Sequence, residues 1–120
     1  MTANEIKNLL KQYQLLVNRM TYLEEIINNY NNRENNKAKT EIIQYNRAVT
    51  EYDYLLNQVE KIINLIDDID NLLNKTIVEK YYIQGEKVEA IASDLDRTDR
   101  WVYKSITKAI NEIARKRTDD

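Results

Sequence analysis

The fold that we expect for this chain rests on residues 88–113, VEAIASDLDRTDRWVYKSITKAINEI. Apolar residues have helical spacing in residues 88–92 and again in residues 102–113. Leu95 lies in the break between the two patterns. Two short amphipathic helices joined by a tight turn are typical of a helix-turn-helix, which usually places its second helix in a groove of DNA. The stretch therefore predicts a helix-turn-helix and indicates binding of double-stranded DNA.

The composition of the chain favours an all-α fold and argues against catalysis. The 120 residues include no Pro and a single Gly, the two residues that normally punctuate strands and turns. They also include no Cys and no His, which removes thiolate nucleophiles, cysteine zinc sites and the commonest general base. We therefore expect a protein that is not an enzyme and that needs no cofactor and no metal.

The sequence indicates a protein of the cytoplasm. It has no run of about 18 apolar residues, the length that a membrane-spanning helix needs, so we expect no membrane contact. The N-terminal stretch MTANEIKNLL lacks the basic start and the continuous apolar segment of a signal peptide.

The first 69 residues carry two long heptad patterns, in which apolar residues recur at alternating steps of three and four. Thr2 and Glu5 form a capping box before the first pattern. The polar stretch NNRENNKAK, residues 31–39, separates the patterns and is predicted to be a loop. We therefore expect a long antiparallel, coiled-coil-like helical hairpin over residues 1–69. The first pattern is Ile6, Leu9, Tyr13, Leu16, Met20, Leu23, Ile27 and Tyr30, and the second is Ile42, Tyr45, Val49, Tyr52, Leu56, Val59, Ile63 and Ile66.

The two patterns have two interpretations. Packing of one helix against the other explains the hairpin itself. Extra apolar residues widen the stripes beyond what one partner helix covers, and long heptad patterns commonly mediate self-association. We therefore expect a homo-oligomer, with a dimer favoured. The extra residues on the first helix are Leu10, Leu15, Val17 and Ile26.

Residues 70–120 are expected to form a small helical domain. The acidic stretch at residues 67–70 interrupts the second pattern, and its aspartates can cap a new helix or kink a continuous one. The new helix would run from Asn71 to about Ile83 and end at Gly85. A short helix over residues 86–94, a turn at residues 95–97, and a last helix capped by Thr98 and ending near Arg115 would follow, before a frayed tail at residues 115–120.

The charge of the chain is unevenly distributed. Residues 1–96 carry 11 Lys or Arg and 16 Asp or Glu, a net charge of −5. Residues 97–117 carry seven basic and two acidic residues, a net charge of +5, although the whole chain is at −2. A local basic surface on an acidic body suits a nucleic-acid-binding module.

The last predicted helix has a basic face opposite its apolar face. At 100° per residue, the apolar face carries Val102, Ile106, Ala109 and Ile113. The opposite face carries Arg100, Lys104, Thr107 and Asn111, flanked by Tyr103 and Lys108. Arg and Lys pair with guanine or phosphate, Asn can pair with adenine, and Thr can touch a thymine methyl group. The candidate DNA-binding residues are therefore Arg97, Thr98, Arg100, Tyr103, Lys104, Thr107, Lys108 and Asn111.

These residues divide by expected role. Because the start of the second helix approaches the bases in this motif, we expect Arg100, Tyr103 and Lys104 at base edges. The residues expected nearer to phosphates are Lys87, Arg97, Thr98 and Lys108. A merely solvated amphipathic helix would also have a polar face, but the absence of acids from this face favours DNA binding. Trp101 flanks the apolar sector and is expected to pack at the edge of the core rather than to stack on a base.

Residues 77–113 resemble region 4 of the sigma-70 family. That family pattern has a Tyr-rich helix, a Gly turn, an Ile-Ala pair, a Leu, a Ser or Thr cap, a Val and a later Ala. The chain also looks like small phage transcriptional regulators of the ArpU and RinA type, which carry this domain behind a helical N-terminal part. The matching residues are Tyr81, Tyr82, Gly85, Ile91, Ala92, Leu95, Thr98, Val102 and Ala109.

The resemblance covers about a third of the chain and departs from the family at the turn. The turn usually reads Leu-Gly-Ile/Val-Ser, but here Asp96 replaces the Gly and Arg97 replaces an apolar residue that would cover the turn. The other sigma regions are missing, so the resemblance implies an accessory regulator rather than a complete sigma factor. It also implies RNA polymerase as a possible partner, in the cytoplasm of a bacterial host.

These patterns lead to one expected function and two alternatives. The expected function is a sequence-specific transcriptional regulator, an activator of phage or mobile-element origin, with a hairpin for oligomerisation at residues 1–69 and a DNA-binding domain at residues 70–120. The first alternative is the small terminase subunit of a DNA-packaging machine, which also combines a helix-turn-helix with helical oligomerisation. The second is a protein-interaction module that binds host polymerase or another host factor.

Overall fold

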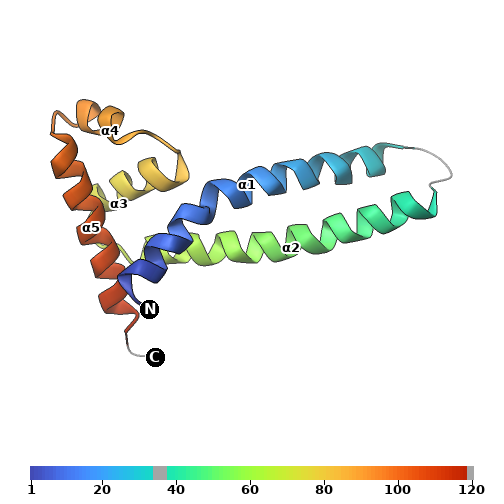
Figure 1. The fold of residues 1–120 in the computed structure, drawn as a ribbon, viewed down its shortest axis with the longest axis horizontal. Coiled ribbons are helices and arrows are strands. Elements are labelled where there is room, and N and C mark those ends of the chain that lie inside the picture. Colours follow the sequence, from blue (N-terminus) through green and yellow to red (C-terminus); the bar gives the residue numbers. More distant parts are fainter. Residues whose placement is uncertain (34–37, 119–120) are drawn as a thin grey trace. The chain divides into compact units, whose positions relative to one another are not determined.

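A computed structural model describes residues 1–33 and 38–118 of the chain, and these residues form helices and no strand (Figure 1). The prediction of an all-α fold is confirmed. Residues 34–37 of the predicted loop and residues 119–120 of the predicted tail lie outside the described residues. The helices are α1 (Ala3–Asn32), α2 (Lys39–Asp67), α3 (Leu72–Val78), the π-helical segment η1 (Glu79–Ile83), α4 (Val88–Asp94) and α5 (Asp99–Lys116).

Side-chain caps fix the starts of three of these helices. The Thr2 hydroxyl oxygen accepts a hydrogen bond from the Glu5 backbone N–H (3.2 Å), as the capping box predicts. The Thr98 hydroxyl oxygen caps α5 by accepting from the backbone N–H of Trp101 (3.1 Å), also as predicted. The cap of α3 is Asn71, which accepts from the Asn74 N–H, so none of the preceding aspartates is the side-chain cap of this helix.

The described chain divides into two compact units, Leu15–Glu60 and Met1–Gln14 with Lys61–Asp120. The units do not coincide with the predicted ranges 1–69 and 70–120, because the first turns of α1 and the last turns of α2 belong to the same unit as α3, α4 and α5. A boundary read from sequence alone follows chain order, whereas this unit is built from two separate segments.

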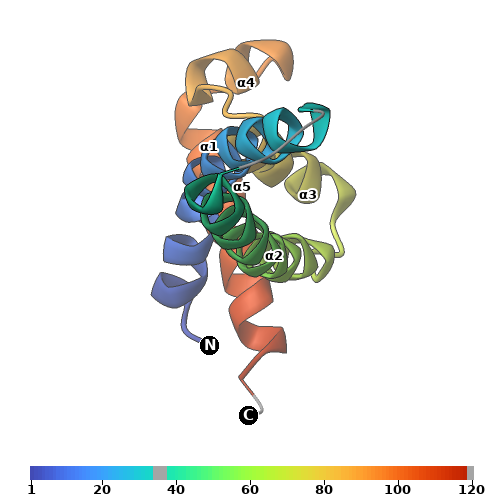
Figure 2. The ribbon, with the colours of Figure 1, turned by 90° about the vertical axis from the view of Figure 1, so that its right-hand side faces the viewer.

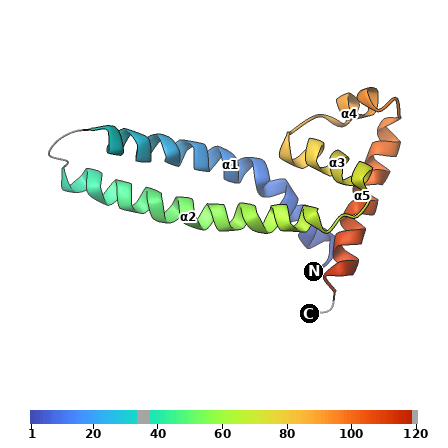
Figure 3. The same cartoon turned by 180° about the vertical axis from the view of Figure 1, so that it is seen from behind.

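The unit Leu15–Glu60 is an antiparallel pair formed by parts of α1 and α2, which lie side by side in Figures 1 and 3. Polar and aromatic pairs join the two helices along their length. The Arg19 guanidinium donates two hydrogen bonds to the Glu51 carboxylate (2.6 and 3.0 Å), and the rings of Tyr30 and Tyr45 stack 4.0 Å apart. The pairing with Arg19 lowers the pKa of Glu51 below its usual value. The buried apolar residues of this unit are Met20, Leu23, Ala48, Leu55 and Val59.

The buried face of α2 differs from the predicted one. Three residues of the predicted pattern, Ile42, Leu56 and Ile63, are 39, 38 and 43% exposed. The row that is buried instead contains Ala48, Leu55 and Ile62. Both rows are apolar, recur every seven residues, and flank the shared row that contains Val59 and Ile66, so periodicity alone could not choose between them. The predicted row is therefore wrong for α2: the apolar row on the other side of Val59 and Ile66 is the buried one.

The second unit encloses a core between α3, η1, α4 and α5, completed by the ends of the two long helices. In Figures 1 and 2, α4 lies beside the beginning of α5. The chain passes between them through residues 95–98, where Asp96 has a φ of 55° and the Arg97 N–H donates to the Ala92 carbonyl (2.9 Å). Residues of this core that are almost fully enclosed are Ile6, Leu10, Ile62, Ile77, Val78, Ile91, Val102 and Ile113.

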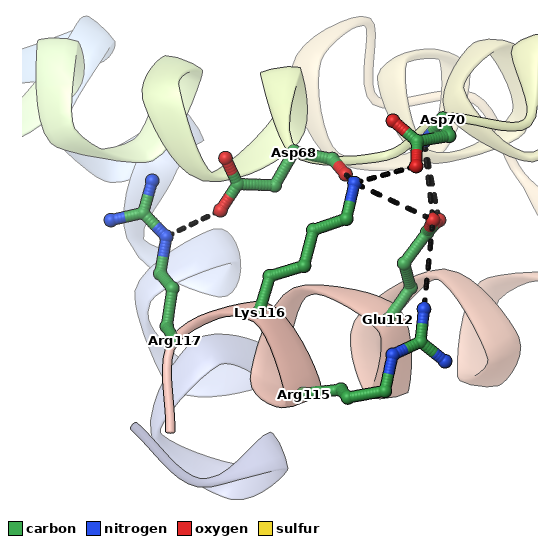
Figure 4. A network of polar contacts seen from close by, with 6 residues as sticks. All are labelled: Asp68, Asp70, Glu112, Arg115, Lys116 and Arg117. Carbon is green, nitrogen blue, oxygen red and sulfur yellow. Dashed lines mark hydrogen bonds and ion pairs between the residues drawn. The ribbon is translucent and has the colours of Figure 1, made fainter. Parts of the chain in front are cut away.

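The end of α5 is anchored to the acidic stretch that follows α2 (Figure 4). Lys116 donates to the Asp68 carbonyl (2.6 Å) and pairs with the Asp70 carboxylate (2.7 Å), and the Arg117 guanidinium pairs with the Asp68 carboxylate (2.5 Å). The hydrogen bond from Lys116 lowers the pKa of Asp70. The Met1 ammonium also donates to the Arg117 carbonyl (2.8 Å). The prediction of a frayed tail is therefore wrong for Lys116 and Arg117.

Candidate nucleic-acid interface

The structure places all eight candidate residues on the surface of one element and the turn before it. Arg97 and Thr98 lie in the turn, and the other six lie on α5; each of the eight side chains is exposed. The opposite side of α5 is buried in the core, through Val102, Ser105, Ile106, Ala109, Ile110 and Ile113. The helical spacing in the sequence therefore separated the solvent face from the core face correctly.

Three cations on this face have no partner among the described residues. Arg100, Lys104 and Lys108 form no hydrogen bond and no ion pair with any of them. The three residues follow each other at intervals of four, so one turn of helix separates each from the next. An unpaired, exposed row of positive charge is available for an anionic partner.

The turn before α5 is organised around Trp101. The guanidinium of Arg97 lies 4.9 Å from the centre of the Trp101 ring, a cation–π contact that joins the turn to the first turn of α5. Trp101 is half-buried. Its backbone carbonyl accepts a hydrogen bond from the Ser105 hydroxyl (3.0 Å). Trp101 thus packs at the edge of the core, as expected.

Polar groups beside the cations can read base edges. Tyr103 is 54% exposed, and neither its hydroxyl nor the Asn111 amide is bonded to a described residue. The Thr107 hydroxyl donates to the Tyr103 carbonyl one turn earlier (3.0 Å), which leaves its methyl group as the part free to touch a partner. The face therefore combines hydrogen-bonding and apolar groups between the charges.

The basic surface is smaller than the sequence indicated. Of the seven basic residues at positions 97–117, Arg115, Lys116 and Arg117 lie against the carboxylates of Asp68, Asp70 and Glu112 (Figure 4). The charge count could not show this, because two of the acids lie more than 40 positions earlier in the chain. The effective basic face consists of Arg97, Arg100, Lys104 and Lys108.

A cleft of about 340 Å³ lies beside this face, and sequence reasoning missed it. The cleft is enclosed by the first turns of α1, by η1 and by α5. Lys7 and Lys11 were not selected, because nothing in the local sequence connects them with α5, about 100 residues later. Its lining residues are Ala3, Asn4, Lys7, Lys11, Tyr81, Tyr82, Tyr103, Ile106, Thr107, Ile110 and Asn111.

The π-helical segment η1 supplies the tyrosines of this cleft. Its wide turn is closed by the Gln84 N–H, which donates to the Glu79 carbonyl five residues earlier (2.9 Å). From α1, Gln14 donates to the carbonyls of Tyr82 (3.3 Å) and Ile83 (2.6 Å), which ties the end of η1 to α1. The Tyr82 ring is only 6% exposed, and its burial raises the pKa of its hydroxyl to about 12.

Within residues 1–33 and 38–118, no group of three or more acidic side chains converges to bind a metal ion. In the same ranges, no helix combines the length and the apolarity needed to cross a membrane. Comparison of the chain with protein-family models, with curated proteins and with solved structures finds no match.

Proposed function

We propose that this chain is a sequence-specific DNA-binding transcriptional regulator of phage or mobile-element type, in which α4 and α5 act as a helix-turn-helix. The observation that carries the proposal is the row of unpaired cations Arg100, Lys104 and Lys108 on the exposed face of α5. What supports an anionic partner is the alignment of these cations, one helical turn apart on one face of the helix that follows a tight turn, which is the geometry suited to DNA.

The proposed docking assigns roles to candidate residues on α5 and in the turn before it. The first half of the helix enters the major groove, where Arg100 and Lys104 can donate to guanine O6 and N7. Asn111 and the Thr107 methyl group lie one to two turns later on the same face and can contact adenine and thymine. Arg97, Thr98 and Lys108 lie at the edges of this face and bind the phosphates.

The charge distribution supports specific binding rather than coating of DNA. The whole chain has a net charge of −2, so phosphate attraction is confined to the face of α5 and its surroundings. Ion pairs hold the basic residues at the end of α5 against acids of the same unit, which removes them from competition for DNA. A protein of this kind approaches DNA in one orientation.

The exposed apolar residues of the hairpin support a homo-oligomer, with a dimer favoured. In the unit Leu15–Glu60, Ile42 and Leu56 of the predicted heptad pattern remain exposed, and so do the large hydrophobic side chains of Leu15, Ile43 and Tyr54. A dimer would present two α5 helices to half-sites about 34 Å apart, one turn of duplex. As an activator in a bacterial host, the protein would also contact RNA polymerase.

Replacement of the two central cations tests the function. Arg100→Ala with Lys104→Ala should abolish retention of a selected duplex. In fluorescence anisotropy, the dependence of log K on log salt should flatten by about 0.9 for each phosphate that the variant no longer neutralises, and discrimination between selected and random duplex should decrease. The double variant should keep wild-type helicity, since both side chains are exposed and unpaired.

The matched control is Lys39→Ala with Lys61→Ala, which removes two exposed and unpaired cations from α2. Like Arg100→Ala with Lys104→Ala, this control removes two positive charges. It should leave the retention of DNA and the discrimination between duplexes close to wild type. If Arg100→Ala with Lys104→Ala also leaves them unchanged, the assignment of this face to DNA is wrong.

A further inference from the structure

The cleft between α1, η1 and α5 has an apolar floor and a cationic rim. Ile106, Ile110 and Tyr82 line it and are each 6% exposed, while Lys7 and Lys11 line it from α1. No acidic residue is among those that line it. A cleft of this composition suits a ligand with an apolar part and a negative charge.

The two lysines are arranged for a pair of anionic groups. Lys7 and Lys11 are one helical turn apart, which places their Cβ atoms about 5–6 Å from each other. Both are exposed, and neither forms an ion pair or a hydrogen bond with a described residue. One DNA strand carries a phosphate about every 3.4 Å of helix axis, so flexible lysines at this spacing can serve two neighbouring phosphates.

A tyrosine whose hydroxyl has no protein partner also lines the cleft. The Tyr82 hydroxyl forms no hydrogen bond with any described residue, although the residue is more than nine-tenths buried. No fully buried side-chain oxygen or nitrogen in the described chain lacks a partner, so this hydroxyl keeps some exposure to solvent. It stays protonated at neutral pH and can donate to an acceptor that reaches it.

The cleft is continuous with the proposed DNA-reading face. Tyr103, Thr107 and Asn111 line the cleft and belong to the exposed face of α5. A duplex whose bases meet α5 therefore has a sugar-phosphate backbone passing next to these residues, on the side where α1 lies. This continuity selects a DNA strand, rather than a free small anion, as the occupant.

We propose that the cleft holds the backbone of one DNA strand beside the bases read by α5, with Lys7 and Lys11 on neighbouring phosphates and a sugar over the apolar floor. The inference rests on the proposed function and extends it: the first turns of α1, outside the helix-turn-helix, are a DNA-binding element. Contacts to backbone carry no sequence information, so these lysines add affinity and fix orientation without adding discrimination.

The test is Lys7→Gln with Lys11→Gln, measured by anisotropy on a selected duplex and on a random duplex between 50 and 200 mM salt. We expect the salt slope to fall by about 1.8, two phosphates at about 0.9 each, so that the wild type loses about 12-fold more affinity across this range than the variant does. Affinity should fall by a similar factor on both duplexes, whereas removal of a hydrogen bond to a base would weaken binding to the selected duplex alone.

Two controls accompany this variant. Lys7→Arg with Lys11→Arg keeps both charges and should keep the wild-type slope. Lys39→Gln with Lys61→Gln removes the same charge elsewhere and should also keep it. A wild-type slope for Lys7→Gln with Lys11→Gln, in a protein that still discriminates the selected duplex, overturns the inference and leaves the function standing. A wild-type chain that binds neither duplex overturns both.

Discussion

At the scale of single residues, Asp96 determines how the chain enters α5. Among the described residues it is the one non-glycine residue with a positive φ, 55°. This left-handed conformation costs most L-residues about 1–2 kcal/mol, and Asp somewhat less because its short polar side chain can hydrogen-bond locally. Gly is the residue that adopts this conformation most readily, and here the chain adopts it with an Asp.

Two substitutions at position 96 separate conformation from charge. Asp96→Gly should raise the free energy of unfolding by about 0.5–1 kcal/mol, because Gly adopts a positive φ without steric cost. Asp96→Ala removes the same carboxylate but keeps the cost of a Cβ atom, and should lower stability by a similar amount. Urea unfolding followed by circular dichroism measures both. Equal midpoints for the Gly and Ala variants would show that φ at this position carries no strain.

Single residues also show where sequence reasoning was limited. Thr98 was predicted as a cap, because capping depends on residues three positions apart. The contact of Arg97 with Trp101 was not predicted, since it depends on the orientation of two side chains. Sequence spacing can predict an interaction that follows from the path of the backbone, such as a helix cap. It cannot predict a contact that depends on which rotamers two side chains adopt.

At the scale of elements, the position of α5 depends on its packing against α4. Two small side chains, Ala92 of α4 and Ala109 of α5, are both buried in the unit that the two helices share. Ala90, on the same short helix, is exposed. The two alanines of α4 therefore offer a matched pair of sites.

Enlarging these alanines should have opposite outcomes. Ala92→Leu should lower the free energy of unfolding by about 1–3 kcal/mol, because overpacking a tight core forces side chains and backbone to move. Ala90→Leu adds the same atoms at the surface and should change stability by less than about 0.5 kcal/mol. Thermal and urea unfolding compare the two, with DNA retention as a second measurement. A fully stable Ala92→Leu protein would mean that Ala92 does not limit the approach of the helices.

Elements were predicted well from sequence where one pattern dominated. Helices were expected from Asn71 to about Ile83, over residues 86–94, and from the Thr98 cap to about Arg115, and the structure has them over residues 72–83, 88–94 and 99–116. The buried face of α2 was not predicted correctly, since two adjacent rows are equally apolar. The anchoring of Lys116 was missed because its partner Asp70 is 46 positions away, with no local signal of the pairing.

At the scale of the whole molecule, the number of chains that assemble distinguishes the proposed transcriptional regulator from a DNA-packaging adaptor. The hairpin exposes apolar residues of α2 at intervals of seven, including Ile42 and Leu56. Such a row can be covered by a second copy of the chain. We expect native mass spectrometry of the purified protein to show two chains, and eight or more would instead favour a ring-forming packaging adaptor.

The same exposed row gives the mutational test of assembly. Ile42→Gln with Leu56→Gln should weaken the dimer at least tenfold, about 1.4 kcal/mol, because two apolar side chains lose their burial against the partner. Asn46→Gln with Asn57→Gln changes exposed polar residues of α2 and should leave association unchanged. Sedimentation at several concentrations measures both variants. An Ile42→Gln with Leu56→Gln protein that associates like the wild type would place the interface elsewhere.

The candidate site was predictable only in the part that lies on one helix. Helical periodicity identified the exposed residues of α5, because every third or fourth residue of a helix shares a face. The cleft residues Lys7 and Lys11 come from the other end of the chain, and only the folded unit brings them beside α5. Sites assembled from distant segments leave no periodic signature.

The discontinuity of the unit that contains α5 has a consequence for how the protein is made. Residues 1–14 leave the ribosome before residues 61–120, with which they form one unit, so Ile6 and Leu10 cannot be enclosed by this unit until residues 61–120 emerge. Closing such a long loop costs entropy before its contacts are formed, and this slows folding. The exposed face of α5 and the cleft beside it therefore come together late in synthesis.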